Sequence, residues 1–525
     1  MTQMNRISSR KHRNRKILCA LLCICLLPVL ASCGENRYRS NELTAAFTEA
    51  ETSYTAPDGD QETAAETEYM LYLPSNDGVR LMGRSVSLMT TGSETDDALA
   101  LVNALLNAEA DEKTNRVGGN VSLQLYENDP VEVSNGVCTV NLGSSALQLE
   151  SRDLYTLGLA MAQTLCQTET IGSVNLLVAD RAVGLDIYEN FPMGSLMPRP
   201  NEEIPTLWDQ LSARMTPVGD DPAGTPYTGS ATLFFPLTDG SGIMPEGRTL
   251  TFAGQTPQIQ AEGLLNALSE GAMYLTDIPK MPDLGSLQTH PPLVTELEEG
   301  GRLITLTFRN EFAKEMTDIG LDPECLTSAV AYTLMTYIPG VTTVHVRLAE
   351  NELTGMRQAE SGTGFTGGLL NRKQLTPCLV SRKVIYLTDG ESLIPVSRAM
   401  SRKESGVPRS LFALLMDGAT ESEEAEGITE TLPVGLTEEN VLGIALEDDR
   451  LLINLDEQFA QEIIRFGKDR EQMLCYSIVN TLCKNTGATN VTFFFESQQR
   501  ETLAGLIYWA GQFLYNPGIA ADSAG

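Results

Sequence analysis

Few residues of this chain have the types and spacing that enzyme chemistry needs. Ser144 and Ser195 carry hydroxyls that could act as nucleophiles, but neither lies in a nucleophile elbow or beside a His or Lys that would activate it. His345 alternates with Val344 and Val346, so it lies on the opposite face of a strand from them, which favours an exposed or hydrogen-bonded imidazole over a general base. With only three histidines and no zinc-ligand spacing, the sequence predicts no catalytic residue, no metal and no cofactor.

Cys33 is the residue with the clearest chemistry. It follows Leu30, Ala31 and Ser32, after a basic stretch and an apolar run, 17–30, that is too short to span a bilayer comfortably and is typical of a secretion signal. The segment resembles the bacterial lipobox, which implies that residues 1–32 are a lipoprotein signal peptide and that the thiolate of Cys33 receives a diacylglyceryl group. We therefore expect a protein held by lipid on the extracytoplasmic face of the cell membrane; an ordinary cleaved signal peptide is the alternative.

The charge of the mature chain restricts its partners. Six of the 37 Lys and Arg residues precede Cys33, whereas none of the 69 Asp and Glu residues does, so the mature chain has a net charge of −38. Such a surface repels nucleic acid and anionic lipid headgroups. We expect no nucleic-acid partner, anchoring by the acyl chains, and basic partners if charge steers their approach.

Six further cysteines remain after Cys33. An even number outside the cytoplasm is compatible with disulfides, but a chain of this length can bury a core without them. Most lie within apolar strand or helix patterns, where small buried residues are usual. They are interpreted as buried thiols, and they are Cys138, Cys166, Cys325, Cys378, Cys475 and Cys483.

An acidic segment rich in Thr, Ala, Glu and Ser, residues 33–68, is predicted to be a disordered tether. A small α/β unit follows it. Apolar periodicity predicts, in order, strand 69–73 with an Asp77-Gly78 turn and a second extended run, a helix at 98–106, strands 121–126 and 137–142, a helix at 154–165 and strand 174–178.

The same order of strands and helices occurs twice more. The second copy has strand 232–235, helix 261–268, strand 303–308, helix 326–337 and strand 344–348, and the third has strand 384–387, helix 411–415, strand 451–455, helix 474–482 and strand 491–495. Spacings this long exceed those of solenoid repeats, so each copy is expected to bury a core of its own. The fold class is therefore α/β (α+β), three tandem small domains, each a sheet packed by two helices in the order strand-helix-strand-strand-helix-strand.

Composition predicts the boundaries between these parts. Pro-rich and Gly-rich stretches usually form exposed connections. The predicted segments are domain 1 at 69–191, a Pro-rich linker at 192–229, domain 2 at 230–356, a linker at 357–381, domain 3 at 382–516 and a tail at 517–525.

Each unit resembles a GerMN domain, the α/β module of bacterial sporulation and spore germination lipoproteins. The resemblance rests on the Asp-Gly turn (Asp77-Gly78, Asp239-Gly240 and Asp389-Gly390), on strands ending Asn141-Leu142, Thr307-Phe308 and Asn454-Leu455, and on second helices ending Thr164-Leu165, Thr333-Leu334 and Thr481-Leu482. It covers roughly residues 69–515. This chain has three such units, whereas the familiar sporulation member has two.

This resemblance implies a protein without catalytic chemistry. Family members are similar in fold to ring-building motifs of secretion-type assemblies, and sporulation members support a transport complex between mother cell and forespore. We therefore expect a non-enzymatic adaptor or scaffold that binds an extracytoplasmic protein assembly, with a small-molecule ligand disfavoured. The alternative is a ligand-binding or sensor-kinase-accessory lipoprotein, since the module also occurs in lipoproteins that accompany a sensor kinase.

Two further sets of residues have competing interpretations. The hydroxyls of Thr164, Thr333 and Thr481 could be functional, but a bond to a backbone carbonyl one turn earlier is favoured. Exposed aromatic residues mark interfaces, so the C-terminal aromatic residues are a candidate partner patch. Similar residues at 184–191 favour packing onto the core instead. The patch comprises Tyr508, Trp509, Phe513 and Tyr515.

Overall fold

The computed structural model places residues 56–525 in one compact unit. Cys33, the predicted signal peptide and most of the predicted tether lie outside the described residues. Within the described part, no helix is long and apolar enough to cross a membrane. The structure describes residues 54–60, 65–91, 93–168, 170–215, 225–298, 300–349, 356–357, 364–365, 368–401, 407–447 and 449–520.

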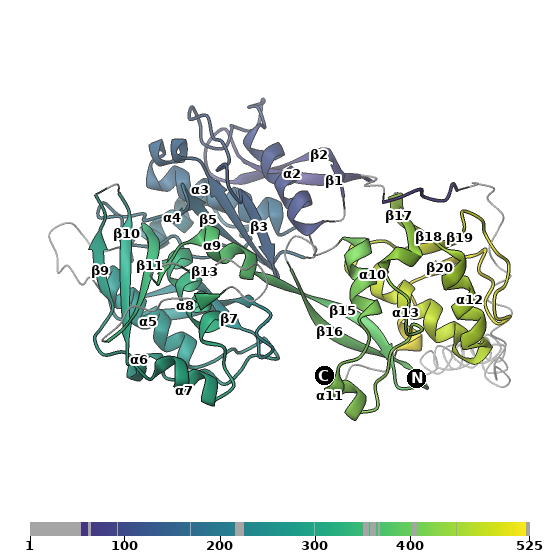
Figure 1. Cartoon of the computed structure of the whole chain (residues 1–525). Helices are drawn as coiled ribbons and strands as arrows, with labels where there is room; N and C mark the ends of the chain where they lie inside the picture. The colour runs from purple at the N-terminus through teal and green to yellow at the C-terminus, as the bar shows by residue number, and fades with distance from the viewer. Residues whose placement is uncertain are drawn as a thin grey trace, which may run out of the picture. The chain divides into compact units, whose positions relative to one another are not determined.

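A long antiparallel hairpin opens each of the three repeats (Figure 1). The turns contain Asp77-Gly78, Asp239-Gly240 and Asp389-Gly390. Each Asp carboxylate accepts the backbone N–H two residues ahead, and each Gly has a positive φ, which a residue with a side chain adopts only with strain. The hairpins are β1 Ala65–Pro74 with β2 Leu81–Thr90, β7 Tyr227–Pro236 with β8 Ile243–Phe252, and β15 Val380–Thr388 with β16 Leu393–Ser401.

A four-stranded sheet completes each repeat. In all three sheets the first pair of strands is antiparallel, the central pair parallel and the last pair antiparallel. The sheets are β3 Val131–Ser134, β4 Val137–Leu142, β5 Ser173–Val178 and β6 Arg181–Ala182; β9 Leu293–Glu296, β10 Arg302–Phe308, β11 Val341–Leu348 and β14 Leu369–Leu370; and β17 Val441–Glu447, β18 Arg450–Leu455, β19 Asn490–Phe495 and β20 Gln512–Leu514. Two further short strands, β12 Met356–Arg357 and β13 Gly364–Phe365, pair with each other.

Two helices in each repeat match the predicted ones, and the predicted fold class is confirmed. The second helix connects the two parallel strands, as parallel pairing requires. These helices are α2 Glu94–Leu106, α3 Ser151–Leu165, α5 Pro257–Ser269, α8 Pro323–Tyr337, α10 Pro408–Met416 and α13 Lys468–Thr486. Shorter helices are α4 Ile204–Ser212, α6 Leu284–Leu287, α7 Phe312–Asp318, α9 Arg372–Leu375, α11 Glu421–Ala425 and α12 Glu457–Phe466, with 3-10 turns at Ser144–Gln148, Thr376–Cys378, Glu438–Asn440 and Pro517–Ile519.

The predicted strand at 121–126 is wrong. Only a single bridge forms there, between Leu125 and Leu142, and the strand paired with β4 is β3. Asn135 and Gly136 both have positive φ, the conformation of a two-residue hairpin turn. Such a turn pairs β4 with the residues immediately before it.

The first two repeats share one hydrophobic core, which corrects the prediction of three separate cores. A series of stacked or tilted rings crosses the boundary between them, from Phe191 to Tyr227, Phe252 and Tyr337, with centroids 4.9–5.1 Å apart. The predicted linker at 192–229 takes part in this core, since α4 buries Leu207 and Leu211 and residues 227–229 already belong to β7. The third repeat has its own core.

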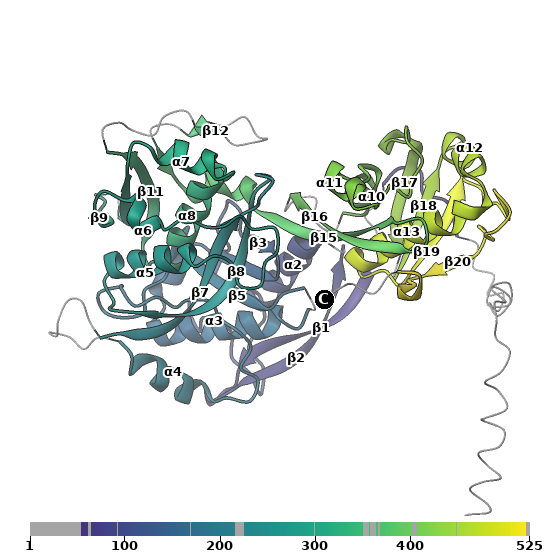
Figure 2. The same ribbon diagram turned by 90° about the horizontal axis from the view of Figure 1, so that it is seen from below.

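The three repeated threonines attach each hairpin to its second helix. The hydroxyl of Thr333 donates to the carbonyl of Ala329 at 2.8 Å, as predicted, and it also accepts the N–H of Phe234 in β7 at 2.9 Å. Thr164 accepts the N–H of Tyr72 at 3.0 Å, and Thr481 that of Tyr386 at 3.1 Å. Figure 2 shows the long ribbon of β15 and β16 to which Thr481 is bonded. Each hydroxyl thus satisfies a strand amide that the helix covers.

Replacing Thr481 by Val should therefore destabilise the third repeat by about 1–3 kcal/mol, because the buried N–H of Tyr386 loses its acceptor while the side-chain volume is kept. Thr481→Ser, which keeps the hydroxyl, should cost less than Thr481→Val. The chain has two tryptophans, Trp208 and Trp509, so urea unfolding followed by fluorescence in a Trp208→Phe background reports on the third core alone. Equal unfolding free energies for the Val and Ser variants would contradict this role.

Candidate functional site

The side chains considered as nucleophiles or bases lie apart. Ser144 is exposed at the start of a 3-10 turn, and His345 lies half-buried on β11. The hydroxyl of Ser195 bonds to Oδ1 of Asn175 at 2.6 Å and to the hydroxyl of Thr232 at 2.7 Å. These polar groups join the first and second repeats. Among the described residues, no group of three or more His, Cys, Asp or Glu side chains could hold a metal ion.

The six cysteines of the described part form no disulfide with one another. Cys138, Cys325, Cys475 and Cys483 are buried, as predicted, whereas Cys166 and Cys378 are half-buried. Burial raises the pKa of Cys166 to about 11 and that of Cys483 to about 12. Both thiols are therefore protonated at neutral pH, which makes them poor nucleophiles.

Two of the C-terminal aromatic residues, Trp509 and Phe513, belong to the third core, which agrees with the favoured interpretation of packing onto the core over a partner patch. Trp509 is fully buried, and its ring makes edge contacts with Phe493 and Phe495 at centroid distances of 5.1 and 5.5 Å. Phe513 is buried beside it. Tyr508 and Tyr515 keep half and a third of their surface exposed, and the Tyr515 hydroxyl lies 3.0 Å from that of Tyr386.

A buried carboxylate holds this aromatic segment in place. Glu471 of α13 is fully buried, and it accepts hydrogen bonds from the backbone N–H groups of Ala504, Leu506 and Ile507 and from Nε1 of Trp509, at 2.7–3.1 Å. Four donors compensate the burial of the charge. Its position could have been found in the sequence, since Glu471 stands three and four residues before Leu474 and Cys475 on the apolar stripe of α13.

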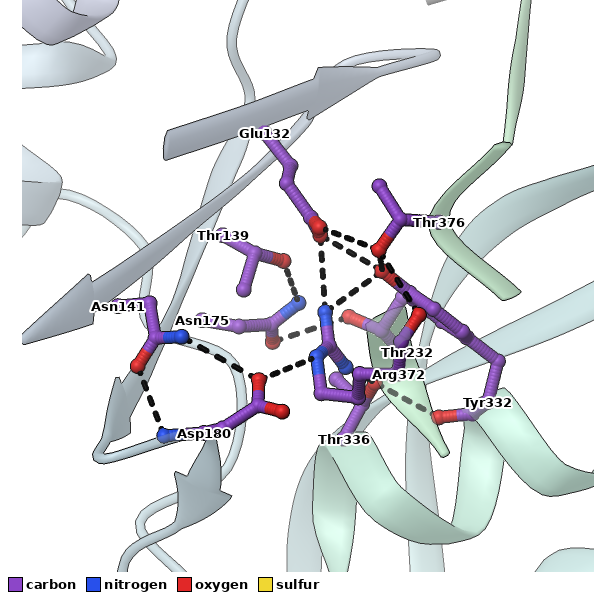
Figure 3. Close-up of polar contacts among 10 residues, drawn as sticks. All are labelled: Glu132, Thr139, Asn141, Asn175, Asp180, Thr232, Tyr332, Thr336, Arg372 and Thr376. Atoms are coloured by element: carbon purple, nitrogen blue, oxygen red, sulfur yellow. Dashed lines mark hydrogen bonds and ion pairs between the residues drawn. The ribbon is translucent and has the colours of Figure 1, made fainter. Parts of the chain in front are cut away.

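A buried polar cluster joins three distant segments of the chain (Figure 3). We call it the Glu132 clasp, and it consists of Glu132 on β3, Tyr332 on α8, and Arg372 and Thr376 in and after α9. One carboxylate oxygen of Glu132 accepts from Arg372 Nη2 at 2.8 Å and from the Tyr332 hydroxyl at 2.7 Å, and the other accepts from Thr376 at 3.0 Å. The clasp thereby connects the first repeat, the second repeat and the segment that precedes the third.

Arg372 is the centre of the Glu132 clasp. Its guanidinium carbon lies 4.1 Å from the ring centroid of Tyr332, and Nη1 donates to the Thr336 hydroxyl at 2.8 Å. Nε lies 3.5 Å from Asp180 at the cluster's edge. The Arg372 and Glu132 side chains are only 3% and 5% exposed. Such burial requires a compensating charge and full hydrogen bonding on each side, and both are present.

The protonation states follow from these contacts. Burial alone would lower the pKa of Arg372, but the neighbouring Tyr332, Glu132 and Asp180 outweigh burial and raise it, so the guanidinium stays charged. Burial raises the pKa of Tyr332 well above its ordinary value, so its hydroxyl keeps the proton that it donates to Glu132. Burial also raises the pKa of Asp180, against the opposing charge of Arg372.

Sequence reasoning missed the Glu132 clasp because Arg372 lies in a segment predicted to be a linker. The available signal was Glu132 itself, which stands between Val131 and Val133 in a strand whose four residues are all buried. A strand buried on both faces forces a charged residue within it to find a partner. The sequence does not say which residue that is.

The first strand of each sheet, β3, β9 or β17, forms one of its two edges. These three edge strands differ in what lies against them. The side chains of β3 contact the segment that leads to the third repeat through the Glu132 clasp. They also contact β15 of that repeat, through a 2.7 Å hydrogen bond from the Ser134 hydroxyl to the carbonyl of Val380. β17 is contacted by residues 57–60. For β9, β10 is the one strand pairing partner among the described residues, and Leu293 on β9 is 61% exposed.

Residues 384–501, most of the third repeat, match the family model described as "Germane: Sporulation and spore germination". Over these residues the third repeat is similar to the Germane family. The first two repeats share the strand and helix order of the third, which agrees with the predicted three GerMN-like units. The match supports a role in sporulation or germination. No curated protein matches the chain.

Solved structures similar to parts of the chain include the tandem GerMN domains of the sporulation protein GerM from Bacillus subtilis, at 14% identity and a TM-score of 0.22, covering 56% of this chain and 99% of that one. The first GerMN domain of the same protein matches at 15% identity and a TM-score of 0.20, covering 25% and 98%. A lipoprotein from Clostridium perfringens matches at 15% identity and a TM-score of 0.18, covering 25% and 88%.

Breaking the Glu132 clasp should destabilise the core shared by the first two repeats. Arg372→Met leaves a buried, unpaired carboxylate and should lower the free energy of unfolding by about 3–5 kcal/mol. Adding Glu132→Gln to Arg372→Met should recover part of this loss, because the buried charge is then removed as well. Hydrogen exchange of α3 and α8 amides measures both effects.

A matched control for this test is Arg80→Met, which removes an ion pair with Glu203 whose side chains are 64% and 45% exposed. It should cost less than about 1 kcal/mol. If Arg372→Met cost no more than Arg80→Met, the Glu132 clasp would not be a stabilising contact.

Proposed function

We propose that this protein is a non-enzymatic, lipid-anchored adaptor on the extracytoplasmic face of the membrane, and that it supports a protein complex of sporulation or spore germination. The Germane match of residues 384–501 supports the process. The lipobox-like Leu30 to Cys33 supports the anchor. The threefold repetition of one sheet supports a binding role, since sheet edges are surfaces on which proteins pair.

The observation that carries this proposal is the edge of β9, beside which the described part of the chain places no further strand. An edge strand exposes unpaired backbone N–H and C=O groups, which another strand can bond to. The N–H of Leu297 donates to the carbonyl of Gly301, so the alternation of an antiparallel ladder directs the backbone groups of Val294 and Glu296 away from β10. We propose that a strand of the partner adds here, with Leu293 as an apolar contact beside it.

A proline at an outward-facing position tests this pairing. Glu296→Pro removes one outward N–H without removing a β9–β10 hydrogen bond, since edge strands tolerate proline on that side. Glu296→Ala is the matched control, because it removes the same side chain and its ion pair with Arg302 but keeps the N–H. Proteins that crosslink to the wild-type chain in sporulating cells should crosslink at least about tenfold less to the Pro variant, the loss expected for one or more backbone hydrogen bonds.

The Ala variant should crosslink like the wild type, and both variants should unfold at similar urea concentrations. Equal crosslinking of the Pro and Ala variants would exclude the β9 edge as the contact.

The anchor is tested separately. Cys33→Ala removes the thiol that would receive the lipid, so the chain should lose membrane retention or stay uncleaved at residue 32. Membrane fractionation and the N-terminal mass of the product measure both effects. A processed Cys33→Ala chain that still fractionates with membranes would contradict lipidation at this residue.

A further inference from the structure

A short segment that precedes the first repeat lies against the sheet edge of the third repeat. The N–H of Gly59 donates to the carbonyl of Leu442 on β17 at 3.1 Å, and the carbonyl of Pro57 accepts from Nδ2 of Asn454 on β18 at 3.0 Å. Pro57 is buried, although its sequence neighbours are partly or fully exposed. Residues 57–60 were predicted to belong to a disordered tether. Their contacts with β17 and β18 correct that prediction for these four residues.

The third repeat carries a recess that matches this segment. A Cβ atom on Gly443 would lie 2.5 Å from the carbonyl oxygen of Gly59 and 2.7 Å from that of Pro57, so a side chain at this position would exclude the segment. Gly443 stands at the register shift of β17, where the strand departs from regular pairing with β18. Among the residues described, the space above Gly443 is therefore filled by the chain's own residues 57–60.

The guanidinium of Arg409 lies at the recess and is held there by contacts within the third repeat. Arg409 of α10 donates to the carbonyls of Glu438 and Val441, at 3.1 and 3.0 Å, so the third repeat itself holds the guanidinium in place. The same guanidinium forms a two-point ion pair with the carboxylate of Asp60. The N–H of Ile444 also donates to Asp60 Oδ1 at 3.1 Å. The carboxylate is thus recognised by both charge and backbone.

We propose that Gly443, Asn454 and Arg409 form a peptide-binding notch, and that the chain's own Pro57–Asp60 segment is its resident ligand, acting as a releasable latch on the β17 edge. The ligand class is an extended peptide with a buried proline, a glycine and a carboxylate. This inference does not depend on what binds β9.

Three features make this contact a latch rather than a part of the core. Pro57–Asp60 contributes no residue to the third hydrophobic core, and the Asp60 and Arg409 side chains are 45% and 25% exposed, so the ion pair is weakened by solvent. The segment belongs to the same chain as the notch, and such intramolecular linkage supplies an effective concentration that reaches the millimolar range. A contact that is weak by itself is therefore occupied in the intact chain.

A labelled peptide of residues 54–60 measures the notch directly. In the purified full chain the resident segment competes with the peptide. Pro57→Ser together with Asp60→Ser removes that competitor, so the double variant should bind the peptide about tenfold more tightly than the wild type, as expected for release of a millimolar intramolecular ligand. Asp58→Ser, in an exposed neighbour, should bind like the wild type.

A pair of Gly→Val variants, at Gly443 and at Gly247, tests the notch itself. Adding Gly443→Val to the double variant should abolish peptide binding, whereas adding Gly247→Val, at an exposed strand glycine with no atom near the position of its Cβ, should leave it unchanged. Equal affinity of the wild type and the double variant, or binding that survives Gly443→Val, would overturn the proposal. A wild-type dimer that dissociates in the double variant would show that the segment binds a second copy instead, and would overturn the latch within one chain.

Discussion

A carboxylate cannot be buried in a sheet without a partner, and the arrangement of the first two repeats depends on how Glu132 meets this constraint. Its partners come from segments 200 and 240 residues further along the chain. Satisfying Glu132 therefore places α8 of the second repeat and the α9 segment against the first sheet. The shared core and the polar contacts of Ser195 with Asn175 and Thr232 then follow along the same boundary. The third repeat satisfies its own buried carboxylate, Glu471, with donors from within the repeat, and its core is separate.

The three repeats share the contacts within each repeat and differ in the segments that lie against their first sheet strands. All three use a threonine hydroxyl to hold the hairpin and an Asp-Gly turn to close it. Their first sheet strands differ in what lies beside them: α9 at β3, residues 57–60 at β17, and no described strand at the outer side of β9. Segments outside the repeats, one before the first repeat and one between the second and the third, thus lie against two of the three edges that the repeated module would otherwise expose.

The apolar pattern of each segment predicted the helices and strands. How these elements pack together depends on contacts between residues far apart in the sequence. The six main helices and the central strands follow from apolar periodicity, which a single segment carries by itself. The pairing of Glu132 with Arg372 does not, because nothing near either residue specifies the other. Trp509 illustrates the same limit: the sequence favours packing onto the core but does not identify Glu471, 38 residues earlier, as the acceptor of its indole N–H. The open edge of β9 and the notch at Gly443 likewise depend on which segments happen to lie nearby.

The separation of Glu132 and Arg372 in the sequence also limits the order in which parts of the protein can fold. In a chain that crosses the membrane as it is synthesised, N-terminus first, Glu132 reaches the far side 240 residues before Arg372. At ordinary rates of synthesis this interval is about 10 to 50 s. During that time the first sheet has its carboxylate but lacks its cation, so Glu132 must stay hydrated and β3 must stay accessible. Completion of the first domain is therefore a late event in biogenesis, coupled to delivery of the segment that precedes the third.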